Sequence, residues 1–362
     1  MESQKKIYNI AFTGGGTGGH IYPGLAIISF IQKQIPYRIF WIGFSSTDRK
    51  IVEEAGIDFY SIPSGKLRRN FSLKNVIDIF KVMAGYVVSR KILKKERPLM
   101  LFSKGGFVSV PPVIAAASLK IPVFSHESDL SPGLATKINL RFTEKHFIPY
   151  MESLHYYSRK YREKIDVSGN PVRLEFQSAD SSKGRGFLGL NKEQPLVLVL
   201  GGSSGSLEIN RLVRESLLDI TAHYTVVHQT GPNEGITLEP AEKYKPYVYL
   251  REELPHIIAA ADLIICRGGA GTIWECAFLD KPMIIIPLMG KGTRGDQVEN
   301  ARIFERAGIA INLSDNKSAQ RLVSVVAGFA SGELALKKAD KGILKKQACE
   351  YIAERIIENI RR

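Results

Sequence analysis

Two glycine-rich turns contain the residue types that bind anions. The first is Gly14–His20 (GGGTGGH) and the second is Gly201–Ser206 (GGSSGS). Each turn follows a short apolar run and precedes a stretch with a helical pattern. Such a turn leaves backbone N–H groups unpaired at a helix N-terminus, where the partial positive charge favours phosphate or another anion. We therefore expect an anion site in each half of the chain, and two such turns can face each other across a cleft.

A third segment that could do chemistry is Cys266–Glu275 (CRGGAGTIWE), which begins at the end of an apolar run and opens a helical pattern. The amide groups at that helix start could hold a pyrophosphate. Glu275, in the first turns, could accept two hydrogen bonds from vicinal ribose hydroxyls. A glycine-rich connector whose glutamate complements the helix dipole fits the segment equally well. The segment alone leaves both interpretations open.

The first turn also matches the G-x-G-x-x-G pattern of dinucleotide-binding folds through Gly14, Gly16 and Gly19. That fold places a carboxylate about 20 residues further on, at the end of the second strand, where it binds the ribose. Here the second predicted strand ends at Trp41–Phe44, which contains no acid. The dinucleotide hypothesis is therefore disfavoured. The P-loop pattern G-x-x-x-x-G-K-[ST] occurs nowhere, which disfavours an NTPase.

The length and composition indicate a two-domain protein of a reducing cytoplasm. The 362 residues, 44% of them hydrophobic, are enough for two buried cores. The three cysteines, Cys266, Cys276 and Cys349, form no C-x-x-C pair, so we expect neither a disulfide framework nor a structural zinc site. We expect no signal peptide, because no small-residue cleavage site follows the N-terminal apolar segment. No run reaches the roughly 18 apolar residues of a membrane span.

The net charge of +14 is concentrated in one part of the chain. Between Tyr60 and Met100, ten basic residues stand against two acidic ones. A solvated helix face explains such a run about as well as any partner does. Apolar residues recur there at helical spacing, however, so one amphipathic helix within Leu73–Leu93 could present an apolar ridge bordered by lysines to an anionic membrane surface. The predicted membrane residues are Val76, Ile77, Phe80, Met83, Lys74 and Lys81. We expect no nucleic-acid partner, because no recognised motif of that class accompanies the patch.

Short apolar runs alternate with helical patterns along the chain, and the alternation starts twice. The first set of predicted strands is Ile7–Thr13, Tyr37–Ile42, Leu99–Ser103, Ile121–Ser125 and Lys145–Ile148. The second set is Leu196–Leu200, Tyr224–His228, Val248–Leu250, Leu263–Cys266 and Met283–Ile286. Continuous apolar strands between helices are typical of parallel sheets covered on both faces. The pattern predicts an α/β protein of two doubly wound, Rossmann-like domains.

Glycine and proline interrupt the chain at Ser168–Pro171, so we place the domain boundary there. The N-terminal domain is predicted to span residues 1–168 and the C-terminal domain residues 169–344. The last predicted helix, residues 345–362, precedes no strand and could pack back on the first domain.

Several motifs occur together in one order, and together they resemble one family. They are Gly15–His20, Lys104–Phe107, His126-Glu127, Gly169–Arg173, Gly201–Ser203, Cys266–Ala270, Asp296-Gln297 and Asn300-Ala301. The chain resembles the MurG family of bacterial glycosyltransferases, which belongs to glycosyltransferase family 28, over nearly its whole length. The resemblance implies a GT-B fold, in which two Rossmann-like domains face a cleft.

The resemblance also implies an activity and a location. The expected reaction is inverting transfer of N-acetylglucosamine from UDP-N-acetylglucosamine (UDP-GlcNAc) to the C4 hydroxyl of lipid I, the undecaprenyl-pyrophosphoryl-N-acetylmuramoyl-pentapeptide. The product is lipid II, used for peptidoglycan, the cell wall that determines cell shape and is needed for division. The enzyme would work as a peripheral protein on the cytoplasmic face of the inner membrane, with possible cell-wall synthesis proteins as further partners. No cofactor is expected, and the chain has no D-x-D metal motif.

Donor-binding residues follow from the resemblance, position by position. Arg173 and Ser203 would hold the phosphates, Glu275 the ribose and Gln297 the hydroxyls of the transferred sugar. Further contacts, several of them through backbone groups, are implied for Thr17, Gly18, Gly19, Asp129, Arg251, Ala270, Gly271 and Thr272.

The acceptor side would be formed by Gly15 and Gly16 of the first turn with Lys104, Gly105, Gly106 and Phe107, which would cradle the pyrophosphate of lipid I. The acceptor hydroxyl loses a proton as it attacks, so a nearby base is expected. His20 is the leading candidate, although a histidine after a glycine turn could equally fix the loop. Glu127 and Asp129 are the rivals.

Two departures from the family pattern affect particular contacts. Many members have His-Glu-Gln-Asn where this chain has His126-Glu127-Ser128-Asp129, so the sugar contact would be a carboxylate that can only accept hydrogen bonds. The uracil-facing pair, often aromatic then aliphatic, is Leu250-Arg251 here, so base stacking would be lost. Two other functions stay open: a non-hydrolysing UDP-GlcNAc epimerase, and a membrane-surface scaffold with a degenerate nucleotide site.

Overall fold

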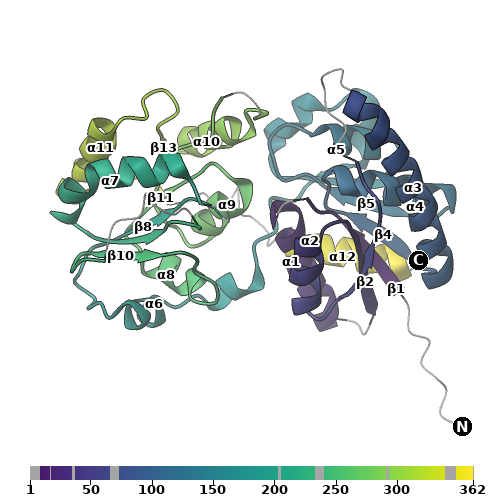
Figure 1. Ribbon diagram of the computed structural model, residues 1–362, viewed down its shortest axis with the longest axis horizontal. Coiled ribbons are helices and arrows are strands. Elements are labelled where there is room, and N and C mark those ends of the chain that lie inside the picture. Colours follow the sequence, from purple (N-terminus) through teal and green to yellow (C-terminus); the bar gives the residue numbers. More distant parts are fainter. Residues whose placement is uncertain are drawn as a thin grey trace, which may run out of the picture. The chain divides into compact units, whose positions relative to one another are not determined.

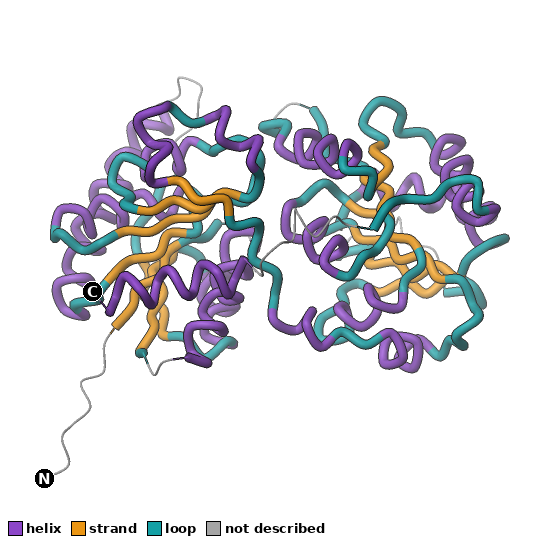
Figure 2. Tube along the Cα trace, turned by 180° about the vertical axis from the view of Figure 1, so that it is seen from behind, coloured by secondary structure: helices purple, strands orange, loops and turns teal. Residues whose placement is uncertain are grey.

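The computed structural model divides the chain into two compact units, Met1–Arg173 with Lys345–Arg362 and Leu174–Leu344 (Figure 1). It describes residues 9–16, 18–34, 37–65, 73–202, 205–232, 240–290, 293–338 and 348–361, without the side chains of residues 73–76. Each unit is built on one parallel sheet with helices on its faces (Figure 2). The predicted fold class, two doubly wound α/β domains, is confirmed.

The first unit contains a seven-stranded sheet of order β3-β2-β1-β4-β5-β6-β7, in which every pairing is parallel. Its strands are β1 (Asn9–Thr13), β2 (Arg38–Gly43), β3 (Asp58–Ser61), β4 (Met100–Ser103), β5 (Val123–His126), β6 (Lys145–Ile148) and β7 (Ile165–Val167). Its α-helices are α1 (Gly18–Gln34), α2 (Ser46–Glu54), α3 (Leu73–Glu96), α4 (Val110–Ser118), α5 (Leu134–Asn139) and α12 (Ala348–Arg361). Short 3₁₀ turns occupy η1 (Phe107–Ser109), η2 (Met151–Tyr156) and η3 (Arg159–Lys164).

The second unit contains a six-stranded parallel sheet of order β10-β9-β8-β11-β12-β13. Its strands are β8 (Leu196–Leu200), β9 (Thr225–Gln229), β10 (Tyr244–Tyr247), β11 (Leu263–Cys266), β12 (Met283–Ile285) and β13 (Ala310–Asn312). Its helices are η4 (Leu174–Ser178), α6 (Ser181–Leu188), α7 (Leu207–Thr221), α8 (Leu254–Ala260), α9 (Ala270–Phe278), α10 (Asp296–Arg306) and α11 (Ala319–Ser331).

The central strands are buried because they are apolar at successive positions. In β1, Ile10 and Phe12 join the core on one face of the sheet, whereas Ala11 joins the core on the other face. Successive strand residues point to opposite faces, so a strand covered on both faces must be apolar throughout. The second unit follows the same rule in β8, LVLVL, which is buried at all five positions.

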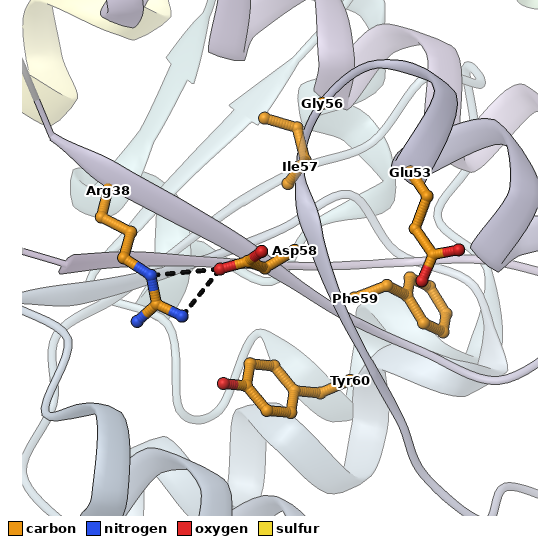
Figure 3. A pocket seen from close by; sticks show the side chains of 7 residues that line it. All are labelled: Arg38, Glu53, Gly56, Ile57, Asp58, Phe59 and Tyr60. Atoms are coloured by element: carbon orange, nitrogen blue, oxygen red, sulfur yellow. Dashed lines mark hydrogen bonds and ion pairs between the residues drawn. The ribbon is translucent and has the colours of Figure 1, made fainter.

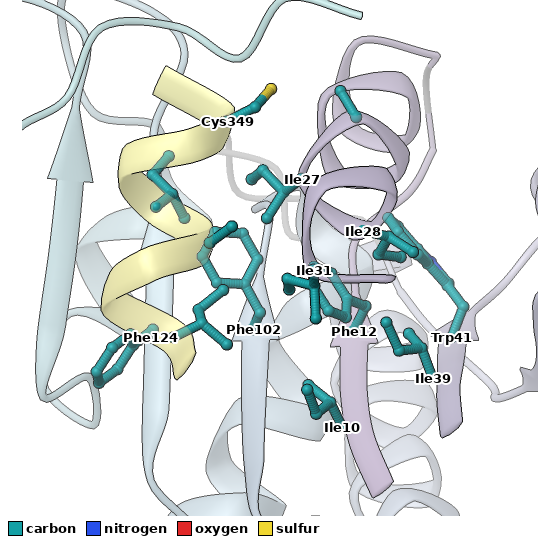
Figure 4. Packing of buried hydrophobic residues seen from close by; sticks show 14 of the residues in the cluster. Ile10, Phe12, Ile27, Ile28, Ile31, Ile39, Trp41, Phe102, Phe124 and Cys349 are labelled. Atoms are coloured by element: carbon teal, nitrogen blue, oxygen red, sulfur yellow. The ribbon is translucent and has the colours of Figure 1, made fainter. Parts of the chain in front are cut away.

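The final described helix, α12, packs on the first unit although it follows the second unit in sequence (Figure 4). Its Ile352 and Ile356 are fully buried, in the same cluster as Ile27 and Ile31 of α1 and Phe102 of β4. The opposite face of the sheet is covered by residues such as Leu93 of α3 and Val113 of α4. Helix α12 therefore covers sheet surface that would otherwise expose aromatic side chains to water.

One predicted strand was wrong and four strands were missed. Val248–Leu250 is not a strand, because the chain pairs with β9 four residues earlier, through Tyr244–Tyr247. Pro246 is tolerated there because β10 lies at the edge of the sheet. The other missed strands, β3, β7 and β13, also lie at sheet edges, and their burial is incomplete. Partial burial does not require a continuous apolar run.

The packing of α12 predicts a large effect of truncating one of its side chains. Ile352→Ala should lower the free energy of unfolding by about 2–5 kcal/mol, because it opens a cavity in a closed core. Urea denaturation measures this loss. The exposed Glu354 on the same helix is the control, and Glu354→Ala should change the unfolding free energy by less than about 0.5 kcal/mol. Equal effects of the two substitutions would contradict the placement of α12.

Candidate functional site

The first glycine turn, which follows β1, is anchored by a buried carboxylate that sequence analysis did not identify. Asp48, 3% exposed, accepts a hydrogen bond from the Gly16 N–H at 3.2 Å, and it also closes a capping box with Ser45 at the start of α2. A Cβ atom on Gly15 would lie 2.3 Å from Asp48 Oδ2, so the turn admits no side chain there. One amide of the turn, that of Gly16, is thus already bound by a carboxylate. Among the described residues, Asp48 does not bond the amides of Gly18 and Gly19 at the start of α1.

His20, on the first turn of α1, lies against the second predicted acceptor segment. A Cβ atom on Gly106 would be 3.0 Å from His20 Cδ2, and one on Gly105 would be 3.8 Å from His20 Nδ1. On the other side, a Cβ atom on Gly16 would be 2.6 Å from the Phe107 ring. The structure therefore brings the first turn and the segment from Lys104 to Phe107 together. Both sets of glycines are needed for this close approach of two loops and an imidazole.

Lys104 follows β4 directly, and its side chain is turned into the protein. It is 1% exposed, and its Nζ donates a hydrogen bond to Ser128 Oγ at 2.6 Å. Burial lowers the pKa of Lys104 to about 8, and the neighbouring carboxylates of Glu127 and Asp129 partly oppose that shift. The ammonium group thus faces the loop that follows β5.

Glu127 organises that loop through both carboxylate oxygens. Oε1 accepts hydrogen bonds from the backbone N–H groups of Ser128 at 2.9 Å and Asp129 at 3.3 Å. Oε2 accepts from the Gly133 N–H at 3.1 Å and from Thr136 Oγ1 at 2.6 Å. Glu127 is 5% exposed, so a role as loop anchor accounts for its position. All four donors belong to this loop and the start of α5.

The segment from Ser168 to Arg173 is tied to the same region of the first unit. His126 Nε2 lies 3.0 Å from the Gly169 carbonyl oxygen, and Asn170 Nδ2 donates to the Ser128 carbonyl oxygen at 2.8 Å. The Arg173 guanidinium lies 5.6 Å from the centroid of the Tyr22 ring on α1. Arg173 is therefore placed beside the helix that opens at the first glycine turn. Its expected partner Ser203 lies outside the described residues, as does Thr17.

In the second unit, Gln229 connects the other glycine turn to the loop after β10. Its Nε2 donates to the Gly202 carbonyl oxygen at 3.3 Å, and its Oε1 accepts from the Leu250 N–H at 2.9 Å. Leu250 is buried, whereas Arg251 is exposed and its guanidinium lies 5.7 Å from the centroid of the Tyr249 ring. Sequence analysis missed this pair, a half-exposed aromatic ring beside a cation.

A three-residue ion cluster fixes the segment that leads into α9. Glu208, in the first turn of α7, contacts Arg267 Nη1 at 2.6 Å and Lys317 Nζ at 3.3 Å. Arg267 also donates to the Ile286 carbonyl oxygen at 3.2 Å, and Lys317 donates to that of Pro287. The cluster therefore joins the carboxyl ends of β8, β11 and β12. The Arg267 charge is paired with Glu208 inside the unit.

The start of α9 has the features of an anion site. Its N-cap is Gly269, which supplies no side-chain cap, so the first-turn amides of Ala270, Gly271 and Thr272 carry no such hydrogen bond. Glu275 is half-buried one turn further on. Gln297, at the start of α10, packs against this turn: a Cβ atom on Gly268 would be 2.3 Å from the Gln297 carbonyl oxygen. Gln297 Oε1 accepts from the Leu288 N–H at 2.8 Å.

A pocket of about 510 Å³ lies elsewhere, beside β2 and β3 (Figure 3). It is lined by Arg38, whose guanidinium contacts Asp58 at 2.7 Å, and by Tyr60 and Phe59 among others. Arg38 is level with Asn9 at the amino end of β1, whereas the glycine turn leaves the carboxyl end. Ligands of open parallel sheets bind at the carboxyl ends of the strands. The pocket is therefore not part of the candidate site.

The described part of the chain contains no group of three or more acidic, histidine or cysteine side chains arranged to hold a metal ion. Each unit has candidate groups of its own: the first unit has the glycine loops with His20 and Arg173, and the second unit has the start of α9 with Glu275. These are groups that bind phosphates and hydroxyls.

Comparison with protein-family models gives two matches in chain order. Residues 10–148 match the glycosyltransferase family 28 N-terminal domain, and residues 196–356 match the glycosyltransferase family 28 C-terminal domain. Together the two matches cover most of the chain.

Curated relatives agree with the family models. A protein from Treponema denticola is 45% identical over 83% of this chain and 82% of its own length. One from Bacillus cereus is 41% identical over 96% of this chain and 99% of its own length. Both are named UDP-N-acetylglucosamine--N-acetylmuramyl-(pentapeptide) pyrophosphoryl-undecaprenol N-acetylglucosamine transferase, the second with the suffix 2.

Solved structures share the fold at low identity. Acinetobacter baumannii MurG superposes with a TM-score of 0.70 at 20% identity, covering 97% of this chain and 99% of its own. The UDP-GlcNAc 2-epimerase from Methanocaldococcus jannaschii gives a TM-score of 0.67 at 18% identity, with the same coverage. The fold is therefore common to transferases and epimerases and does not separate them.

The four hydrogen bonds to Glu127 predict that its charge stabilises the fold. Glu127→Gln should lower the free energy of unfolding by about 1–3 kcal/mol, because a neutral amide places an NH₂ group opposite N–H donors. Urea denaturation at pH 7 measures the change. Glu144→Gln removes a charge from an exposed glutamate of the same unit and should have almost no effect. A Glu127→Gln protein as stable as this control would show that the loop does not depend on the carboxylate.

Proposed function

The chain belongs to glycosyltransferase family 28, and on that premise we propose that it transfers N-acetylglucosamine from UDP-GlcNAc to the C4 hydroxyl of lipid I, forming lipid II. The observation that carries the proposal is the 40–45% identity, over most of the chain, to relatives that are named for this transfer. The epimerase and scaffold hypotheses are not favoured, because these relatives at 40–45% identity are named for the transfer.

We place the donor mainly on the second unit. The uncapped amides at the start of α9 suit the diphosphate of UDP-GlcNAc, and Glu275 suits the ribose hydroxyls. Arg173 and Ser203 would share the negative charge that develops on UDP as it leaves. Gln297 would bind the transferred sugar, with its NH₂ group as the donor, since its oxygen accepts from Leu288. In this proposal, helix amides and an arginine stabilise the negative charge on the leaving UDP.

We place the acceptor on the first unit, at the two glycine loops that meet around His20. In the proposed step the C4 oxygen of lipid I attacks C1 of N-acetylglucosamine from the face opposite UDP. The C1–O bond to UDP breaks, and the hydroxyl proton passes to a base. The hydrogen bonds to Glu127 support a structural role for it, which leaves His20 and Asp129. We propose His20, because its imidazole lies against the acceptor loop and a neutral imidazole can accept a proton.

The exposed face of α3 supports contact with an anionic membrane surface. Ile77, Phe80 and Met83 are 58%, 66% and 58% exposed, and Lys81 beside them is exposed too. Basic side chains near an anionic bilayer contribute about 1 kcal/mol each. The side chains of the predicted membrane residues Lys74 and Val76 lie outside the described residues. No described helix is long and apolar enough to cross a membrane. We therefore propose peripheral binding at the cytoplasmic membrane surface, where lipid I presents its headgroup.

Transfer of labelled N-acetylglucosamine to a short-chain lipid I analogue tests the reaction and two residue roles. His20→Ala should lower kcat by roughly 10²–10⁴-fold with unchanged UDP affinity, as expected for loss of a general base. Glu275→Ala should weaken UDP-GlcNAc binding by about tenfold or more, because the ribose hydroxyls lose a charged acceptor. Glu333→Ala, at an exposed position of the second unit, is the control and should behave like the wild type. Failure of the wild-type protein to transfer the sugar, while it still binds UDP-GlcNAc, would reject the proposed function.

Vesicle sedimentation tests the membrane surface. Phe80→Glu with Met83→Glu should reduce binding to phosphatidylglycerol vesicles by at least about tenfold, because two apolar contacts become charges that the bilayer repels. Leu218→Glu is a matched control on the second unit, at a leucine that is 87% exposed. Equal binding by the double variant and the control would place the membrane contact elsewhere.

A further inference from the structure

Lys104 is a buried cation whose surroundings are set by one loop. A charged amine with 1% exposure is costly unless opposite charge and hydrogen bonds compensate it. The compensation comes from Ser128 Oγ at 2.6 Å and from the carboxylates of Glu127 and Asp129. Cys349 of α12 and the buried His126 and His146 also interact electrostatically with Lys104. A side chain so enclosed cannot reach a phosphate without leaving its partners.

The two carboxylates near Lys104 have different tasks. Glu127 is buried and both of its oxygens accept hydrogen bonds from the loop that follows it. Asp129 is half-buried, so part of the residue reaches solvent, and its carboxylate interacts electrostatically with Lys104. Asp129 is therefore the group through which the buried charge can influence a bound sugar.

Ser128, between these two acids, is held from three directions. Its N–H donates to Glu127, its carbonyl oxygen accepts from Asn170, and its hydroxyl accepts from Lys104. The next residue, Asp129, begins with an N–H that is also bound to Glu127. The backbone that carries the Asp129 carboxylate is thus fixed before any ligand arrives. Such preorganisation strengthens the contacts a group makes in a binding site.

We propose that Lys104 is a positioning residue that acts through Asp129: its enclosed ammonium group fixes Ser128 and balances the Asp129 carboxylate, which accepts hydrogen bonds from hydroxyls of the sugar. The proposal rests on the proposed glycosyl transfer. It replaces the expectation that Lys104 itself contacts the acceptor pyrophosphate. An ionised carboxylate is an acceptor-only group, so the ligand it selects must present hydroxyl donors at this position.

A double-mutant cycle tests the coupling in transfer assays with saturating donor and acceptor. Lys104→Met, which keeps the side-chain length but removes the charge, should lower kcat by about tenfold or more. In an Asp129→Asn background the same substitution should lower kcat by less than about twofold, because the charge no longer has a carboxylate to balance. Lys50→Met removes a lysine that is 71% exposed and should leave kcat unchanged. UDP affinity should remain at the wild-type value in every variant.

A titration provides a readout that does not depend on activity. In the wild type, the pKa of Lys104 is about 8, and NMR of protein with ¹³C-labelled lysine can follow it, with Lys104→Met identifying the signal. Asp129→Asn removes a negative charge that favours the ammonium form, so it should lower the pKa of Lys104 further. The other groups that interact electrostatically with this amine, Glu127, Cys349, His126 and His146, stay in place in that variant.

Two results would overturn the proposal. One is a Lys104→Met effect of equal size in both backgrounds, or one that appears only as a raised KM for lipid I, as direct contact with the pyrophosphate requires. The other is an unchanged Lys104 pKa in Asp129→Asn. Failure of the proposed function is seen separately, as the absence of transfer by the wild-type protein, and the titration still decides the coupling in that case.

Discussion

The loops at the carboxyl edge of each parallel sheet depend on internal hydrogen-bond acceptors for their N–H groups and on internal counter-charges for their cations. Buried amides without acceptors are costly, and in this chain a few acids meet much of that need. Asp48 holds the first glycine turn, Glu127 holds the loop that follows β5, and Glu208 holds Arg267 before α9. What remains for a substrate is what these acids leave unoccupied. On the second unit that includes the amides at the start of α9, which receive no side-chain cap.

The fold could be predicted where burial alone determines the sequence. Strands β1, β4, β8 and β11 are enclosed on both faces, so their continuous apolar runs predict them. Edge strands need not be apolar throughout, so an apolar run does not identify them. Strand β3 reads DFYS and β10 reads YKPY, because half-exposed positions accept polar residues and proline. Pairing with β9 determines that Tyr244–Tyr247, and not Val248–Leu250, forms the strand. That constraint comes from outside the segment.

Sequence analysis placed the candidate site on a set of segments, whereas the contacts of each side chain could not be predicted. Spacing and family resemblance identified the glycine turns, Lys104, Glu127 and Glu275. That Lys104 points inward follows from its contact with Ser128, 24 positions away, and the anchoring by Asp48 joins residues 32 positions apart. Such pairings come from the order of strands in the sheet, which local patterns do not encode. Tyr249 was missed for a similar reason, since its partner Arg251 was considered only with Leu250.

Helix α12 makes the chain order of the first unit discontinuous, and this bears on how the protein can be synthesised. During translation, strands β1 to β7 emerge long before Ile352 and Ile356, the side chains that complete their core. Synthesis of the first unit is therefore completed only after the whole second unit has been translated. Until then an apolar face of its sheet lacks part of its cover, a situation in which nascent chains aggregate or engage chaperones. A shortened gene that stops at the domain boundary would encode this unfinished state permanently, whereas replacing Leu174–Leu344 by a short linker would retain the helix.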